Sequence, residues 1–573
     1  MSNCDVLVQN FMSSFQIPGM SIAISKNGKL VYNRSFGNSN ISGTESTYPH
    51  NLFRIASISK PITAIAIMKL YENGQLGLDD KVFGSGGILE NHVFLKNANI
   101  SDTRINNITV RHLLEHTAGW NRDISCFPNP TTPYPWFFGG CDPIAAPMHV
   151  ASSNGRPNPA TEEDMIYFLL QKGLDFTPGT AYSYSNIGYL VLGEVIELKS
   201  GLSYENYVKS QILDPIGAHD MFLGKNLLTN KMEREVEYKG NGYVTLDCYG
   251  NGNYVPWEYG GFNLEAMDAH GGWVATPRDL LRLITAVDGF PSVPDILSPS
   301  TITQMVTPST VFSNYAKGWS VNSGNNWWHT GALDGTATFA ARTYHGYTWA
   351  VFLNKRIIDS NANNFWNALD GLPWNCIANV SNWPTHDLFK TPSIPATEIT
   401  FETISNSSCK VKWTNGNGTK RVLVGRASSP INKFPVDGIS YAANTSFGQG
   451  TNLGNNNIVL FDDTQNEAII TDLQNGIKYY FRVFEYNQNA ETGNYKLYHL
   501  AKSNSFEYLN GCNSSLNLNQ INQSVYKTNG AIVSNATLPN YTVRFQAANH
   551  IELSPGFKSS QGNVFLASLD GCN

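Results

Sequence analysis

The stretch FRIASISKPITA, residues 53–64, sets the fold class and the chemistry that we expect of this chain. Its apolar residues recur at helical spacing up to Gly74, so we predict a helix within residues 52–73. Ser57 and Lys60 lie at the start of this helix, where positions i and i+3 share one face. The sequence therefore predicts a hydroxyl beside an amine, near the positive end of a helix dipole.

Two further patterns could complete a site for nucleophilic catalysis. A serine hydroxyl becomes a good nucleophile when a base removes its proton, and lysine can be that base once burial or another charge disfavours its ammonium form. Tyr184, in Tyr184-Ser-Asn186, could relay the proton as a phenolate, and Asn186 could hold a substrate carbonyl or orient the lysine. His329-Thr-Gly331 predicts a strand edge whose backbone N–H faces a developing oxyanion. Each pattern alone also fits a purely structural role with no part in catalysis, because short motifs recur by chance.

Longer blocks surround these patterns and follow one another along residues 1–380. They are FRIASISKPITA (53–64), VRHLLEHTAG (110–119), FTPGTAYSYSNIGY (176–189), LGEVIE (192–197), PIG (215–217), GGWVATPRDL (271–280), GW (318–319) and HTG (329–331). In this order the chain resembles the serine hydrolases of the class C β-lactamase and low-molecular-weight penicillin-binding protein group.

The resemblance implies an α+β catalytic domain of the β-lactamase/transpeptidase kind, with an antiparallel sheet flanked by helices and a helical lobe. It implies Ser57 as the acylated nucleophile, with Lys60 and Tyr184 sharing the acid–base work. The backbone N–H groups of Ser57 and Ala332 would form the oxyanion hole. No metal and no cofactor is expected. The residues that would bind the substrate amide, its leaving side or a carboxylate are Asn186, His329, Thr330 and Gly331.

One departure from the lactamase pattern bears on the substrate. Lactamases of this type usually carry Lys-Thr-Gly as the third motif, whereas position 329 is His, and a largely neutral imidazole anchors a carboxylate less well than an ammonium. His-Thr-Gly is instead similar to serine DD-carboxypeptidases, and His-x-Gly to D-aminopeptidases. We therefore expect a hydrolase of D-amino-acid-containing peptides, amides or small esters. A penicillin-binding receptor that acylates with little turnover and a β-lactamase are the alternatives.

A competing motif would give a different chemistry. His112-Leu-Leu-Glu115-His116 fits His-x-x-Glu-His, an inverted zinc-peptidase signature with both imidazoles on one helical face. The same residues lie in a block that is structural in the serine family, and nothing nearby offers an obvious third ligand. A zinc peptidase is therefore a third hypothesis, and we expect these residues to be structural.

Residues 121–165 form a longer segment than the family usually has, and we interpret it as a lip over the site. A disulfide between the two cysteines that bracket its Pro-rich loop would close about 15 residues, worth on the order of 3 kcal/mol. Cys512 and Cys572 bracket the last segment in the same way, although all of these could be buried thiols. The aromatic residues would shape an apolar subsite or pack the lip on its own domain. The lip residues are Cys126, Tyr134, Trp136, Phe137 and Cys141.

Composition restricts partners and compartment. The chain has 573 residues, and 39 basic against 45 acidic residues give a formal charge of −6. It thus lacks the basic footprint of a nucleic-acid-binding protein, and no apolar run approaches the ~18 residues of a membrane span. The start, Met1-Ser-Asn-Cys-Asp, has neither a basic stretch nor an apolar h-region, so we expect no secretory signal in this stretch. We expect a mature secreted or periplasmic protein, with a cytosolic protein as the alternative, and a small molecule or short peptide as substrate.

Composition also shifts along the chain. Helices and strands mix over residues 1–385, prolines punctuate a linker at 386–395, and strand patterns with Asn/Gly turns follow. Residues 396–509 resemble a fibronectin type III-like sandwich, and residues 510–573 look like a small β module. We find no short-period repeat of the solenoid kind along the chain. We expect these modules to contact cell surfaces or polymers. Other predicted elements are helices at 5–16, 277–288 and 360–377, and strands at 20–25, 30–36, 327–330, 336–343 and 347–354.

Overall fold

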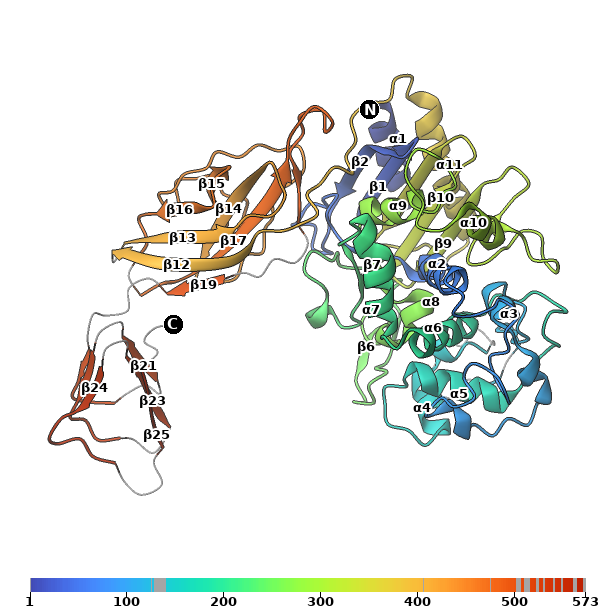
Figure 1. Ribbon diagram of the computed structural model, residues 1–573, viewed down its shortest axis with the longest axis horizontal. Helices are drawn as coiled ribbons and strands as arrows, with labels where there is room; N and C mark the ends of the chain where they lie inside the picture. The colour runs from blue at the N-terminus through green and yellow to red at the C-terminus, as the bar shows by residue number, and fades with distance from the viewer. Residues whose placement is uncertain are drawn as a thin grey trace. The chain divides into compact units, whose positions relative to one another are not determined.

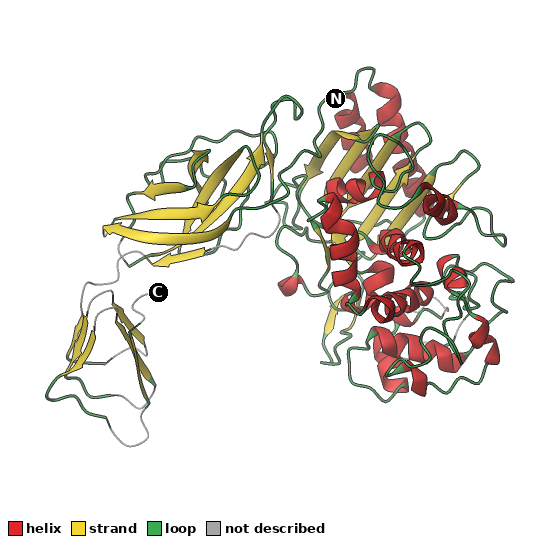
Figure 2. Ribbon diagram, in the orientation of Figure 1, coloured by secondary structure: helices red, strands yellow, loops and turns green. Residues whose placement is uncertain are grey.

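The chain divides into two compact units, Met1–Phe389 and Lys390–Asn573, with a boundary inside the predicted linker. Helices and strands mix in the first unit, whereas every regular element described in the second is a strand (Figure 2). The predicted division of the second unit into two modules stays a prediction. The computed structural model describes residues 2–124, 126–127, 141–405, 407–474, 476–500, 506–509, 516–521, 525–528, 531–538, 542–547, 550–559 and 564–569.

A six-stranded antiparallel sheet forms the centre of the first unit, in the order β2-β1-β11-β10-β9-β8 (Figure 1). The predicted hairpin at its edge is confirmed: Asn27 and Gly28 both have positive φ, at 50° and 75°, as a two-residue turn matching the strand twist requires. The strands predicted at 327–330, 336–343 and 347–354 are also confirmed, as β9, β10 and β11. The strands are β1 (Gly19–Lys26), β2 (Lys29–Gly37), β8 (Ser320–Val321), β9 (Trp327–Leu333), β10 (Thr336–Arg342) and β11 (Tyr347–Leu353).

Helices cover both faces of this sheet, so its strands are apolar on both sides. On β1, Met20, Ile22 and Ile24 pack with α1 (Ser2–Phe15) and α11 (Ala362–Asn379). Ala23, between them, faces the core that contains α2 (Ser59–Glu72) and α9 (Pro277–Thr285). This period-two division builds two separate cores on one sheet.

A helical lobe lies beside the second of these cores. Its elements are α3 (Val110–Leu114), α4 (Pro147–Ser153), α5 (Glu162–Lys172), α6 (Asn186–Ser200) and α7 (Tyr204–Val208). The lobe shares its buried apolar residues with α2, so the two parts form one core. The remaining elements of the unit are α8 (Asp268–Gly271), α10 (Pro299–Val306), and the short strands β3 (Phe53–Arg54), β4 (Met221–Leu223), β5 (Val244–Leu246), β6 (Tyr254–Pro256) and β7 (Trp273–Ala275). The sheet with its flanking helices and this lobe is the predicted α+β, β-lactamase/transpeptidase-like architecture.

The second unit contains antiparallel and parallel sheets. The antiparallel sheets run β12-β13-β16 and β15-β14-β17-β18, with β19 also paired to β17. Nearer the C-terminus, β20-β22-β24 and β21-β23-β25 are parallel sheets, a pairing that the sequence analysis did not predict. Cys512 and Cys572 lie outside the described residues. The strands are β12 (Thr397–Ser405), β13 (Ser408–Thr414), β14 (Lys420–Ala427), β15 (Ile458–Asp463), β16 (Glu467–Ile470), β17 (Lys478–Asn487), β18 (Leu497–Tyr498), β19 (Phe506–Leu509), β20 (Leu516–Leu518), β21 (Val525–Thr528), β22 (Ala531–Ser534), β23 (Val543–Ala547), β24 (His550–Leu553) and β25 (Phe565–Ser568).

Over the described parts of both units, the helices are too short or too polar to cross a lipid bilayer.

A disulfide joins the first and last helices of the first unit. Cys4 on α1 and Cys376 on α11 are fully buried and bonded to each other across 372 residues of chain. We predict that Cys4→Ala/Cys376→Ala lowers the free energy of unfolding of this unit by about 2–5 kcal/mol, because the unfolded chain regains the entropy that the bond removes. Urea denaturation without reductant measures this, and an unchanged midpoint would contradict it.

Candidate active site

Ser57 lies in a short 3-10 helix, η1 (Ala56–Ile58), that leads directly into α2. Ala56, just before it, has φ 48°, a left-handed conformation that is unfavourable for a residue with a side chain. Hydrogen bonds hold this backbone: Ser59 Oγ donates to Ala56 O at 2.7 Å, and Thr338 Oγ1 donates to Ile55 O at 3.0 Å. Ser57 is partly exposed while its neighbours are buried, so its hydroxyl is the group presented to a substrate.

Lys60 is fully buried one helical turn after Ser57. Its Nζ lies 3.2 Å from Ser57 Oγ, 2.8 Å from Asn186 Oδ1 and 2.9 Å from His270 O. Burial, and then the positive charge of Arg122, lower the pKa of Lys60 well below its ordinary value. A neutral amine has two N–H donors for the two carbonyl oxygens, and its lone pair remains for the Ser57 proton. This geometry is that of a base beside a nucleophile.

Tyr184 lies on the other side of the serine. Its hydroxyl is hydrogen-bonded to Ser57, and its ring centroid is 4.8 Å from Lys60 Nζ. Burial raises the pKa of Tyr184, against the opposing effects of the Ser57 hydrogen bond and Arg122. The resting group is therefore a phenol, not the lysine-favoured phenolate that the motif suggested, because burial disfavours the charged form of Tyr184.

Asn186 is the first residue of α6 and lies between two site residues. Its Oδ1 accepts from Lys60, and its Nδ2 donates to Asp142 Oδ2 at 2.6 Å. Of the two predicted alternatives, this arrangement matches the one in which the amide orients the lysine. Asp142 was not among the residues predicted from the sequence.

His329, on β9, is buried within a hydrogen-bonded cluster. Its Nδ1 lies 2.7 Å from Thr330 O, which can only accept, so Nδ1 carries the proton and Nε2 accepts from Tyr315 at 3.3 Å. Burial, then Lys60, lower the pKa of His329 to about 3. Its neutral ring thus has both nitrogens engaged within the protein, which argues against the predicted part of His329 in binding a carboxylate.

The next residues of β9 divide between the two faces of the sheet. Thr330 lines a cavity of about 530 Å³ together with Trp328, Trp349 and Trp366, on the face that α11 covers. Adjacent strand residues point to opposite faces, so Thr330 does not share a subsite with His329. The predicted pairing of these two side chains on one substrate group is therefore not what the structure contains.

Gly331 brings β9 against the segment that carries Ser57. A Cβ at this position would lie 2.1 Å from Ile55 O and 2.3 Å from Thr338 Oγ1, so any side chain would push the strand away. Ala332, the N–H of which is predicted to join the oxyanion hole, is the following residue on β9, and this role stays a prediction.

The residues of the zinc motif do not converge. His112 Nδ1 accepts from the Thr109 N–H in a helix cap, and Glu115 accepts from Lys317 Nζ at 2.8 Å. His116 Nε2 lies 3.1 Å from the Tyr315 hydroxyl. They have structural partners, as expected. Where the chain is described, the only cluster with ligand atoms close enough for a metal is His92, Glu163 and Glu194.

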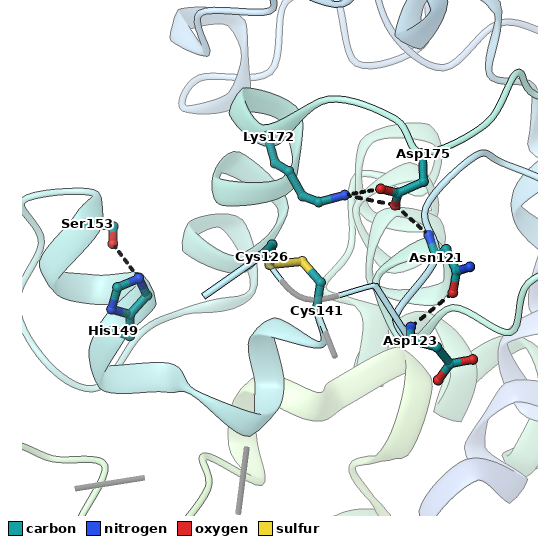
Figure 3. The surroundings of a disulfide bond; sticks show 8 residues. All are labelled: Asn121, Asp123, Cys126, Cys141, His149, Ser153, Lys172 and Asp175. Carbon is teal, nitrogen blue, oxygen red and sulfur yellow. Dashed lines mark hydrogen bonds and ion pairs between the residues drawn. A yellow bond between two sulfur atoms is a disulfide. The ribbon is translucent and has the colours of Figure 1, made fainter. Parts of the chain in front are cut away.

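The predicted Cys126–Cys141 disulfide is present at the base of the lip (Figure 3). The chain before it is fixed by the N–H of Asn121, which donates to Asp175 Oδ2 at 2.8 Å. Phe127 stacks on Phe168 of α5 at 5.4 Å, so this aromatic packs the lip on its own domain. The predicted lip residues Tyr134, Trp136 and Phe137 lie outside the described residues.

Comparison with protein families gives a match to the Beta-lactamase family over residues 5–371, more than half of the chain. The chain belongs to this family. It is a serine hydrolase of the beta-lactamase type, in agreement with the motif order.

Individual relatives are distant. Penicillin-binding protein 4* of Bacillus subtilis (strain 168) is 26% identical over 352 residues, which are 59% of this chain and 68% of that protein. Protein flp of Staphylococcus aureus is 29% identical over 214 residues, 37% of this chain and 36% of that protein. A solved penicillin binding protein from Bacillus halodurans is 21% identical, with a TM-score of 0.47, over 64% of this chain and 99% of that one. For the D-amino acid amidase of Ochrobactrum anthropi SV3 the identity is 20% and the TM-score 0.48, over 65% and 99%.

Sequence reasoning missed the polar residues around this family's motifs. Arg122 and Asp142 lie in the lip on either side of the loop closed by the disulfide, and Tyr315 links His116 to His329. Asp142 had one available signal, its position directly after Cys141 of the predicted disulfide, and Arg122 lies four residues before Cys126. Tyr315 had none, since it lies in a loop between helix α10 and strand β8.

The close approach at Gly331 can be tested by adding one methyl group. We predict that Gly331→Ala slows acylation of Ser57 about 100-fold or more, because β9 must shift by an ångström-scale distance. The matched control is Gly324→Ala in the β8–β9 turn, where a Cβ would meet nothing closer than 3.3 Å. The rate of Ser57 labelling by a fluorophosphonate measures both, and equal rates for the two variants would contradict the role of this contact.

Proposed function

We propose that Ser57 of this beta-lactamase-family hydrolase forms an acyl-enzyme with peptide, amide or ester substrates. The observation that carries the proposal is the buried Lys60 Nζ, 3.2 Å from Ser57 Oγ, with its other contacts directed to two carbonyl oxygens. An amine held in this way is a base at neutral pH, because burial disfavours its charged form.

The reaction follows from the positions of these groups. Lys60 Nζ takes the proton of the Ser57 hydroxyl as the oxygen attacks the substrate carbonyl carbon. The N–H groups of Ser57 and Ala332 receive the oxyanion. Tyr184, hydrogen-bonded to Ser57, gives its phenolic proton to the leaving nitrogen or oxygen as that bond breaks, and recovers a proton from the Lys60 ammonium, which leaves a neutral amine and a phenol for the second step. Water then attacks the ester carbonyl, returns its proton through the same groups, and releases the acid and the free serine.

The substrate class that we propose is D-amino-acid-containing peptides and amides, or small esters. His329 stands where lactamases of this type usually have lysine, and its neutral imidazole has both nitrogens occupied. A penicillin carboxylate would therefore meet no ammonium there. This supports the resemblance of His-Thr-Gly to serine DD-carboxypeptidases over the resemblance to lactamases.

A second candidate is a receptor that is acylated by penicillins with little turnover. The name of the Bacillus subtilis relative, a penicillin-binding protein, favours it. Both candidates need the same nucleophile and base, and they differ in the rate at which water removes the acyl group.

The β modules of the C-terminal unit and the disulfides of the first unit support the proposal that the protein is exported and attaches to a surface or polymer. We propose that residues 396–509 form a fibronectin type III-like domain, since the Gln474 N–H donates to the Tyr479 hydroxyl at 2.8 Å, as in a tyrosine corner, and Trp413 is buried. Two disulfides in the first unit fit an oxidising compartment. We propose a secreted or periplasmic enzyme whose β modules contact cell surfaces or polymers.

A hydrolysis panel tests the function. It contains D-Ala-D-Ala peptides, D-amino-acid amides with their L-enantiomers, a p-nitrophenyl ester and a chromogenic cephalosporin. We predict steady turnover of a D-amide or D-peptide and no steady turnover of the cephalosporin, with every activity absent from Ser57→Ala.

Intact mass after incubation separates the two candidates. A stable cephalosporin adduct without turnover of any other substrate would favour the receptor. Turnover by Ser57→Ala would contradict the mechanism.

A further inference from the structure

A chain of hydrogen bonds connects the lip to the base of the reaction. Asp142 Oδ2 accepts from Asn186 Nδ2 at 2.6 Å, and Asn186 Oδ1 accepts from Lys60 Nζ at 2.8 Å. A carboxylate can only accept, so the amide must turn its NH₂ toward Asp142 and its oxygen toward the lysine. Asp142 thereby decides which way Asn186 points.

The same lip places a positive charge beside the site. Arg122 lies 4.0 Å from Asp142 Oδ2, and its guanidinium is 4.9 Å from the centroid of the Tyr184 ring. The Cys141 N–H donates to Arg122 O at 2.6 Å, which joins the two ends of the lip. The Cys126–Cys141 disulfide lies between these two charged residues in the sequence and bonds their flanking segments.

We propose that Asp142 is a positioning residue that acts through Asn186 on Lys60, and that the Cys126–Cys141 disulfide holds Asp142 and Arg122 at the site as an opposed pair of charges. This inference rests on the proposed function, because it assigns the lip to the control of the same base. Neither residue touches the reacting atoms. Their effect is on the orientation and the charge state of the lysine.

The signs of the two charges make the proposal specific. Arg122 lowers the pKa of Lys60, and ionised Asp142 raises it. Burial raises the pKa of Asp142 itself, and Arg122 opposes that effect by favouring the carboxylate. The histidines near Lys60 are neutral, because burial lowers the pKa of each one. Tyr184 and Tyr189 are phenols, because burial raises their pKa values. The groups that face Lys60 are Arg122, Asp142, His116, His270, His329, Tyr184 and Tyr189.

The test is the pH dependence of Ser57 labelling by a fluorophosphonate, followed by intact mass. Lys60 must be neutral to take the proton, so labelling falls as pH falls through its pKa. Asp142→Asn keeps an acceptor for Asn186 but loses the charge, and should move this acid limb to lower pH by about one unit. Arg122→Gln should move it to higher pH by a similar amount, and the double variant should return near the wild-type position.

Asp142→Ala removes the acceptor as well, and should slow labelling about tenfold or more at every pH. The matched control is Asp79→Asn, which breaks the exposed Asp79–Arg111 pair at 2.7 Å and should leave the profile unchanged. If the acid limb of the labelling profile stays at the wild-type pH in both Asp142→Asn and Arg122→Gln, this inference is overturned and the proposed function is not. Absence of Ser57 labelling in the wild-type protein would overturn the proposed function and this inference with it.

The disulfide has its own test. Cys126→Ala/Cys141→Ala should slow labelling about tenfold or more, because Asp142 and Arg122 are no longer held. Ser57 of the Cys4→Ala/Cys376→Ala variant, measured well below its unfolding temperature, should be labelled at the wild-type rate. The bond removed there joins α1 to α11 and packs in the core between them. Equal rates in the two double variants would overturn the part assigned to the lip disulfide.

Discussion

The removal of one amine from water is the constraint on which the rest of this site depends. An isolated ammonium at a fully buried position is so costly that the group loses its proton instead. Lys60 lies in the first turn of α2, and almost every residue of that turn and the next two is buried. The two acceptors that its amine needs come from α6, through Asn186, and from the end of α8, through His270 O. The helical lobe and α8 thus complete the surroundings of the proposed base, which the sequence places beside the proposed nucleophile.

The sheet contributes the other half of the site through close contact. Gly331 lets β9 lie against the segment before Ser57, and Thr338 on β10 donates to the carbonyl of Ile55 in that segment. Ala56 is held at positive φ between these contacts and α2. Strain of this kind persists only where the surroundings fix the backbone, and here they fix it on both sides of the nucleophile.

Local periodicity predicted the parts of this arrangement that depend on neighbours in the sequence. The i, i+3 spacing gave Ser57 and Lys60 on one helical face, and Asn27-Gly28 gave the hairpin. The same reasoning, applied to β9, separates His329 from Thr330, because adjacent strand residues face opposite sides. The family motif had placed His329 and Thr330 together at the substrate. The two-residue period of a strand was the better guide, since it places their side chains on opposite faces of β9.

Contacts between segments that lie far apart in the chain could not be predicted from the sequence. The Cys4–Cys376 bond crosses 372 residues, and cysteine spacing does not determine connectivity. Asp142 meets Asn186 across 44 residues, from a lip without helical or strand periodicity. The parallel strands of the second unit pair at unequal spacings along the chain, so no fixed period in the sequence indicates this pairing.

The protonation state of Lys60 is the most direct measure of this account. It can be followed by ¹³C NMR of the lysine ε-carbons during a pH titration, with the Lys60 signal identified as the one missing from Lys60→Met. We predict that this carbon titrates well below the ordinary lysine value of 10.5, apart from the surface lysines. Titration of Lys60 together with the surface lysines would mean a charged amine at neutral pH, and would contradict the account.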